Sequence, residues 1–148
     1  MPRFFPAQSL CIAALLAFCA PVFGATSGAD PFLPPQSIVV LLAGLAGDIE
    51  SENAYREQLQ SWIEIVQQSK AATEIFVLTE NPQSLELPAH FSAKRWKAER
   101  AEFAKLGEVL VSRTNPVVVI AWGHGGRQGS TPVFHVRGPR ITPADFKN

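Results

Sequence analysis

Cysteine is scarce in this sequence, and it is confined to one end. Of the 148 residues, only Cys11 and Cys19 are cysteines. Residues 25–148 therefore contain no thiol. This excludes a disulfide bond, a cysteine-ligated metal site and a cysteine nucleophile from that part of the chain.

An excess of charge is absent as well. The chain has 13 Lys and Arg against 13 Asp and Glu, with no basic stripe. Nucleic-acid binding, which relies on clustered cations that neutralise phosphates, is therefore not expected. The segment after Trp122 is glycine-rich, but Gln128 stands where a dinucleotide fingerprint needs glycine. His124 and His135 lack a helical metal-ligand spacing and a third ligand, so neither a metal nor another cofactor is expected.

A long hydrophobic run is missing too. The apolar segment Leu10–Phe18 is shorter than the roughly 20 residues that a membrane span needs. Arg3 precedes it and small residues follow, which is the pattern of a cleaved signal peptide with its cut after Gly24. We therefore expect residues 1–24 to be removed and the product to be secreted or periplasmic, without a stable membrane span. The alternatives are an uncleaved N-terminal anchor and a lipoprotein attached at Cys19.

Two apolar patterns alternate along the rest of the chain. Residues 25–36 are small, polar and proline-rich, which is typical of a linker, and residues 37–148 form the predicted domain. Short apolar runs predict buried strands, and apolar residues at helical spacing predict amphipathic helices. The predicted elements, in order, are a strand Ser37–Ala43, a helix from Ile49 to Gln68, a strand Glu74–Thr79, a helix from Ser92 to Ser112 and a strand Val117–Trp122.

Strands that alternate with helices in this way predict a three-layer α/β/α fold with a mainly parallel sheet. We expect a short hairpin within Pro132–Gly138 to follow, and then a helix start capped by Thr142, with Pro143 in its first turn. The third strand would then lie at an unpaired edge of the sheet. We therefore expect the domain to be incomplete or to need a partner, and to self-associate through that edge.

In open parallel sheets, ligands bind beyond the carboxyl ends of the strands. The loops that follow the three predicted strands all lie at this edge. Asp48, Trp122 and Arg127 are candidate substrate-binding residues there. Each also has a purely structural interpretation: Asp48 as a helix cap, Trp122 as a packing residue beneath a helix, and Arg127 as a solvated loop arginine.

The stretch Val117–Gly126, VVVIAWGHGG, ends a buried strand in a His-Gly pair. Two strand–helix units precede it, and VFHVRGPRITPADF follows it. This arrangement, from Ser37 to Phe146, resembles the caspase/legumain-like cysteine peptidases, and among them the bacterial caspase-like proteins. The resemblance implies a caspase-like fold in which His124 is the general base and the N–H of Gly125 binds the oxyanion. It also implies a peptide or protein substrate.

Such peptidases need a cysteine nucleophile, which the resemblance places after a further strand that this sequence does not contain. Several functions therefore stay open. The chain is half of a peptidase site, with His124 as its base, or it is an exported binding or interaction domain without catalysis. An esterase of the α/β-hydrolase type would use the HGG motif as its oxyanion loop, although no G-x-S-x-G nucleophile motif is present. In the plainest interpretation, His124 is a turn residue with no chemistry.

Overall fold

One strand that is buried along its whole length organises the fold. The computed structural model describes residues 32–147, and in it all seven residues of β1 (Ser37–Ala43) are buried. The neighbours β2 (Ala72–Thr79) and β4 (Val117–Trp122) both pair with β1 in parallel, and β3 (Lys94–Lys97) pairs in parallel with β2. The sheet order is β3-β2-β1-β4. A continuous apolar run such as β1 is typical of a parallel strand that is covered on both faces.

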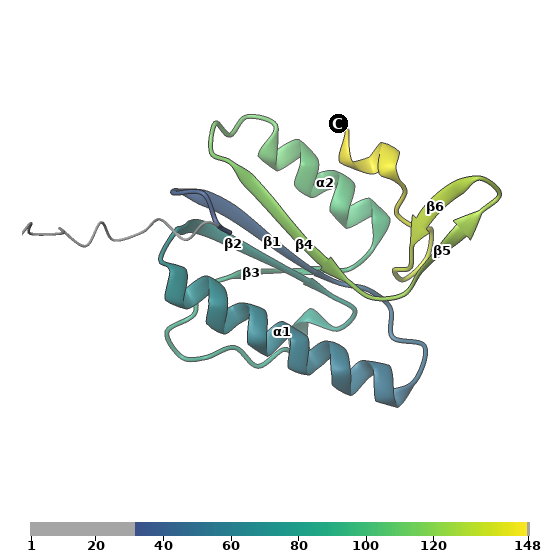
Figure 1. Ribbon diagram of the computed structural model, residues 1–148, viewed down its shortest axis with the longest axis horizontal. Coiled ribbons are helices and arrows are strands. Elements are labelled where there is room, and N and C mark those ends of the chain that lie inside the picture. The colour runs from purple at the N-terminus through teal and green to yellow at the C-terminus, as the bar shows by residue number, and fades with distance from the viewer. Residues whose placement is uncertain (1–31, 148) are drawn as a thin grey trace, which may run out of the picture.

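Two helices cover opposite faces of this sheet, so the predicted three-layer α/β arrangement is confirmed (Figure 1). Helix α1 (Ile49–Ser69) buries Leu59, Ile63 and Val66, which lie at helical spacing. Helix α2 (Arg100–Leu110) buries Phe103 and Leu106 against the other face. The core on the α1 side consists of Leu33, Val39, Leu41, Leu59, Ile63, Val66, Val77, Phe91 and Ile120. The core on the α2 side consists of Ile38, Val40, Leu42, Phe76, Leu78, Ala98, Phe103, Leu106, Val136 and Ile141.

The second helix begins later than the sequence predicts. The helix expected from Ser92 starts at Arg100, and β3 takes up part of the predicted helical segment. The side chain of Trp96 lies on β3 and meets the ring of Phe76 edge-on, with 6.1 Å between ring centroids. Short edge strands commonly carry lysines, and here Lys94 is exposed at the edge. This charge pattern is the one that a solvated helix face also shows.

After β4 the chain forms a hairpin that starts within the glycine-rich motif. Strand β5 (Gly125–Gln128) pairs antiparallel with β6 (Thr131–Phe134) across a two-residue turn. Gly129 has a φ of 62° in that turn, a conformation that glycine adopts without strain. The hairpin therefore begins earlier than the predicted segment. The predicted start at Thr142 is confirmed, because Thr142 is the N-cap residue of the short 3₁₀ helix η2 (Pro143–Phe146), where the carboxylate of Asp145 accepts the Thr142 backbone N–H at 2.7 Å.

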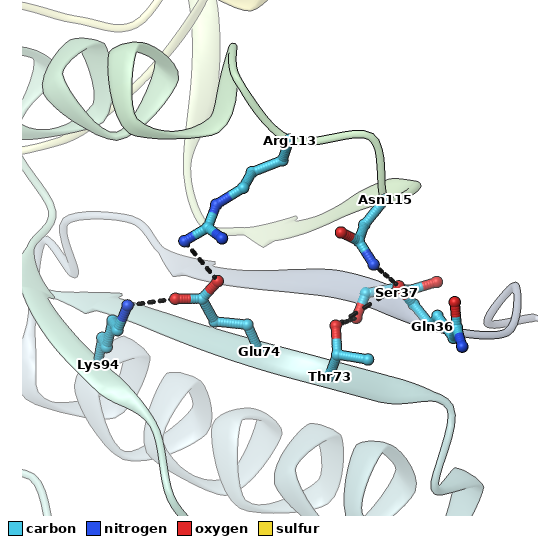
Figure 2. Close-up of polar contacts among 7 residues, drawn as sticks. All are labelled: Gln36, Ser37, Thr73, Glu74, Lys94, Arg113 and Asn115. Atoms are coloured by element: carbon cyan, nitrogen blue, oxygen red, sulfur yellow. Dashed lines mark hydrogen bonds and ion pairs between the residues drawn. The ribbon is translucent and has the colours of Figure 1, made fainter.

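Polar contacts close the amino end of the sheet. Figure 2 shows the residues that make them: Gln36, Ser37, Thr73, Glu74, Lys94, Arg113 and Asn115. The carboxylate of Glu74 pairs with Lys94 of β3 and with Arg113, which follows α2, at 3.4 Å. The amide of Asn115 donates to the carbonyl of Gln36 at 2.8 Å. These groups satisfy one another, so this end of the sheet is a structural closure.

The last residues of the predicted linker pack onto the domain. Leu33 is fully buried in the core on the α1 side, and Phe32 stacks on Trp62 of α1 with ring centroids 5.6 Å apart. The predicted signal peptide, including Cys11 and Cys19, lies outside the described residues. Within residues 32–147, neither helix combines the length and the apolar character of a membrane span.

Strand β4 lies at the edge of the sheet. Among residues 32–147 it pairs only with β1, and its other side carries no strand. Val117 and Val119 are 42% and 37% exposed, and both point to the face that α2 covers only in part. Because an unpaired edge strand offers a row of free N–H and C=O groups beside apolar side chains, it is a template for association.

We therefore expect the purified chain to self-associate through β4. The substitution Val119→Lys adds a charge to this edge and should shift the population towards monomer, as measured by sedimentation velocity over a range of concentrations. Val111→Lys, at a valine that is 76% exposed and outside any strand, is the matched control and should leave the association unchanged. A wild-type monomer that stays monodisperse at high concentration would contradict this expectation.

A second prediction concerns the loop after β1, where the backbone leaves no room for a side chain. A Cβ atom on Gly44 would lie 2.9 Å from both the His135 carbonyl oxygen and the Phe134 ring. Gly44→Ala should therefore lower the free energy of unfolding by about 2 kcal/mol or more. In Gly125→Ala the new Cβ meets its nearest atom at 3.6 Å, so this control should change stability by less than about 0.5 kcal/mol in urea titrations.

Candidate functional site

The parallel register brings the ends of β1, β2 and β4 to one edge of the sheet. Ala43 is opposite Trp122, and Leu42 is opposite both Leu78 and Ala121. The loops that follow these strands therefore leave the sheet together. This is the edge at which open parallel sheets bind ligands, and it is where the sequence predicts the site.

Two glycines let the backbones after β1 and β4 touch. A Cβ built on Gly123 would lie 2.9 Å from the Cα of Gly44, and Gly123 has a φ of 149°. The N–H of Gly44 donates to the carbonyl of Trp122 at 2.8 Å, and the N–H of Leu45 donates to the carbonyl of His135. Because this contact needs glycine on both sides, the backbone at Gly123 is held in place immediately before His124.

His124 stands exposed at this edge, with its main chain fixed and its ring against α1. The N–H of His135 donates to the carbonyl of His124 at 3.0 Å. The imidazole lies 5.8 Å from the ring of Tyr55, and its Nε2 is 3.5 Å from the hydroxyl oxygen of Ser51. Both partners belong to the first two turns of α1. The ring is thus both accessible to solvent and oriented by its neighbours.

Asp48 is the N-cap of α1, as one of its two interpretations predicts. Its Oδ1 accepts the backbone N–H of Ser51 at 2.7 Å, and its Oδ2 accepts the Ser51 hydroxyl at 3.1 Å. These two hydrogen bonds, backbone first, hold the pKa of Asp48 below its ordinary value, with a smaller contribution from His124. Asp48, Ser51 and His124 therefore form a chain from carboxylate to hydroxyl to imidazole.

The order of this chain decides what it can do. In a Ser-His-Asp triad the carboxylate contacts the imidazole, which takes the proton from serine. Here the Ser51 hydroxyl donates its hydrogen bond to the carboxylate of Asp48 and not to the imidazole, so Ser51 is not an activated nucleophile. The Ser51 oxygen still has lone pairs that can accept Nε2–H, and in that tautomer the Nδ1 of His124 is free to accept a proton.

Trp122 packs beneath α1 and does not project into solvent. Its indole N–H donates to the carbonyl of Tyr55 at 3.2 Å, and its half-buried ring packs against the core on the α1 side. Desolvation by burial, and next the charge of Asp48, raise the pKa of Tyr55, while the backbone N–H of His124 acts in the opposite direction. Tyr55 therefore stays a neutral phenol between His124 and the core.

The other candidate residues lie on the hairpin. Gly125 directly follows His124 and begins β5 opposite Phe134. Arg127 is exposed, and its guanidinium donates to the carbonyl of Ser130 across the hairpin turn at 3.2 Å. The fold thus brings Asp48, His124 and Trp122 to α1, whereas Arg127 hydrogen-bonds within its own hairpin.

Sequence reasoning missed two features of this edge. The contact of Ser51 with the imidazole is one, and the position of Tyr55 beside His124 is the other. Beside Tyr55 lies a cavity of about 530 Å³, walled by α1, the end of β2 and the loop that contains η1 (Pro82–Ser84).

Among residues 32–147, no three His, Cys, Asp or Glu side chains are grouped so that they could hold a metal ion.

Comparison with protein-family models, with curated proteins and with solved structures found no match to this chain.

The cap at Asp48 predicts a pH-dependent stability. Because the folded state lowers the pKa of Asp48, the ionised carboxylate stabilises the fold above the ordinary value of 3.8, and this contribution disappears as the pH falls through the lowered pKa. Asp48→Ala should therefore lower the melting temperature at pH 7, and the difference from wild type should shrink below about pH 4. Asp48→Asn, which keeps a capping oxygen, should lose less at pH 7. A difference that stays constant from pH 7 to pH 3 would argue against this cap.

Proposed function

We propose that this chain supplies the base half of an exported cysteine-peptidase-like site, with His124 as general base and the Gly125 N–H as oxyanion donor. The observation that carries the proposal is the position of His124. It is exposed at the carboxyl end of β4, at the edge where no described strand follows, and its Nε2 contacts Ser51. A strand that paired with this edge would run about 4.8 Å from β4, so a thiol at its end would reach the imidazole.

The chemistry of the complete site would divide between the two strands. The imidazole takes the proton from the thiol, and the thiolate attacks the carbonyl carbon of a peptide. The carbonyl oxygen then carries the negative charge, which the N–H of Gly125 stabilises. As the carbon–nitrogen bond breaks, His124 returns the proton to the leaving amine. In this scheme the described residues contribute the base and the oxyanion donor only.

A binding domain without catalysis is the second candidate, and the composition favours it. Residues 25–148 contain no cysteine, and the hydroxyl of Ser51 donates to Asp48 instead of to the imidazole. The coding sequence beyond Asn148 separates the two candidates. A buried strand ending in cysteine supports the peptidase, whereas a stop codon, or Ser or Ala at that place, supports the binding domain. The sheet does not support the esterase alternative, because all four of its described strands are parallel.

The proposal that the chain is exported is supported by its N-terminal sequence pattern, which predicts cleavage after Gly24. The product, residues 25–148, would then be free of thiols, which makes a direct test of His124 practical. It also means that a thiol-directed peptidase probe should leave the wild-type product unlabelled.

We expect His124 to activate a thiol that is placed beside it. In Ser51→Cys the new sulfur replaces an oxygen that lies 3.5 Å from Nε2, and it is the sole thiol of residues 25–148. Its alkylation by iodoacetamide at pH 7 should be at least about fivefold faster than in Ser51→Cys/His124→Ala, because a nearby imidazolium stabilises the thiolate.

The comparison isolates the imidazole, since both variants keep the helix N-terminus and Asp48. The rate difference should disappear above about pH 9, where an ordinary thiol with a pKa of about 8.5 is ionised in any case. Equal alkylation rates of the two variants at pH 7, with both shown to be folded by circular dichroism, would overturn the role of His124 as a base.

A further inference from the structure

The polar groups of His124 are held by the protein on every side but one. Its carbonyl accepts the N–H of His135 at 3.0 Å, and its own N–H interacts with the hydroxyl of Tyr55. The ring atom Nε2 lies 3.5 Å from the hydroxyl oxygen of Ser51. Among residues 32–147, the other ring nitrogen, Nδ1, has no hydrogen-bond partner. Nδ1 is therefore the polar group of His124 that remains open to a reactant.

The direction of the contact between Ser51 and His124 depends on where the hydroxyl hydrogen of Ser51 goes. A serine hydroxyl has one hydrogen to donate and lone pairs that accept. Its oxygen lies 3.1 Å from Oδ2 of Asp48 and 3.5 Å from Nε2 of His124. Because the carboxylate is both nearer and charged, it makes the stronger hydrogen bond and takes the hydrogen. Towards the imidazole, Ser51 can then only accept, so this contact forms when Nε2 carries the ring hydrogen.

The charge of Asp48 prevents the opposite arrangement. Hydrogen bonds from the backbone N–H of Ser51 and from its hydroxyl lower the pKa of Asp48, with a smaller contribution from His124. The carboxylate is therefore ionised near neutral pH, and an ionised carboxylate has no hydrogen to donate. Ser51 must be the donor to Asp48, and this leaves it as the acceptor for His124.

We propose that Asp48 and Ser51 are positioning residues for His124, which keep the hydrogen of the neutral imidazole on Nε2 and leave Nδ1 as the atom that accepts a proton. This inference rests on the proposed function, since it names the atom of the general base that takes the proton from the thiol. In that step Nδ1 gains the proton, the Nε2–H stays directed at Ser51, and neither Ser51 nor Asp48 gains or loses one. The thiol approaches the side of the ring that faces away from Ser51.

NMR spectra of the ring nitrogens test this proposal directly. At about pH 9, above the ordinary histidine pKa of about 6.5, the ¹⁵N shifts give the ratio of the Nε2–H form to the Nδ1–H form. The signals of His124 are those that disappear in His124→Ala. Ser51→Ala removes the acceptor, so the ratio should fall at least about fivefold, the amount that one net hydrogen bond provides. Ser51→Thr keeps a hydroxyl and should stay within about twofold of wild type.

Asp48→Asn distinguishes a positioning role from a purely structural one. The amide oxygen keeps the cap by accepting the N–H of Ser51, so the amide NH₂ group takes the place of Oδ2. This NH₂ group donates to the Ser51 oxygen, and the hydroxyl hydrogen turns to Nε2. The Nδ1–H form is then favoured, and the ratio should fall below that of Ser51→Ala.

Glu50→Gln is the matched control for the loss of charge. Glu50 is an exposed carboxylate in the same first turn of α1, and its side chain makes no hydrogen bond to Ser51 or His124. The variant should leave the ratio within about twofold of wild type, because the contact between Ser51 and Asp48 is unchanged.

Two results would overturn the proposal, in variants whose amide spectra show that they are folded. One is a ratio in Ser51→Ala within twofold of wild type, and the other is a ratio in Asp48→Asn no lower than in Ser51→Ala. No thiol takes part in this measurement. A failed tautomer result therefore leaves the alkylation test of His124 standing, and equal alkylation rates would refute the base without changing these ratios.

Discussion

The complete burial of β1 is the constraint on which the rest of this structure depends. Its seven residues are all buried, and both neighbours hydrogen-bond to it along its length. An unpaired polar group inside such an interior costs free energy, so the polar groups of the sheet gather at its two ends. At the amino end, Glu74 and its two cationic partners satisfy one another (Figure 2). The carboxyl end keeps an exposed imidazole and a hydroxyl without a partner.

The glycine contact at the end of β1 decides how that edge is arranged. Because Gly44 and Gly123 touch through their backbones, β4 ends close to β1 and the chain then turns outward at His124. The loop from β1 to α1 is short, so the first turn of α1 lies beside the same point (Figure 1). Ser51 meets the imidazole for this reason, although 73 positions separate them in the sequence.

The sequence predicts best those elements in which burial on one or two faces fixes the spacing of the apolar residues. β1 and β4 match their predicted bounds, and α1 differs by one residue at its end. Strand β3 was missed because its polar residues fit either a helix surface or a sheet edge, and only pairing with β2 decides between them. The cap at Asp48 is a local signal and was predictable. The contact of Ser51 with His124 and the unpaired hydroxyl of Thr79 arise only in the tertiary fold, so no local sequence pattern predicts them.

The start of α1 links the imidazole of His124 and the cavity at this edge. Ser51 faces the imidazole, while Glu52 and Arg56 of the same turns line the cavity, and Tyr55 borders both. The cap at Asp48 defines where the helix begins, and therefore sets the position of all four side chains at once. A ligand that moved Tyr55 would displace a neighbour of His124, because the tilted rings are in contact. The imidazole and the cavity therefore share one support, the first two turns of α1.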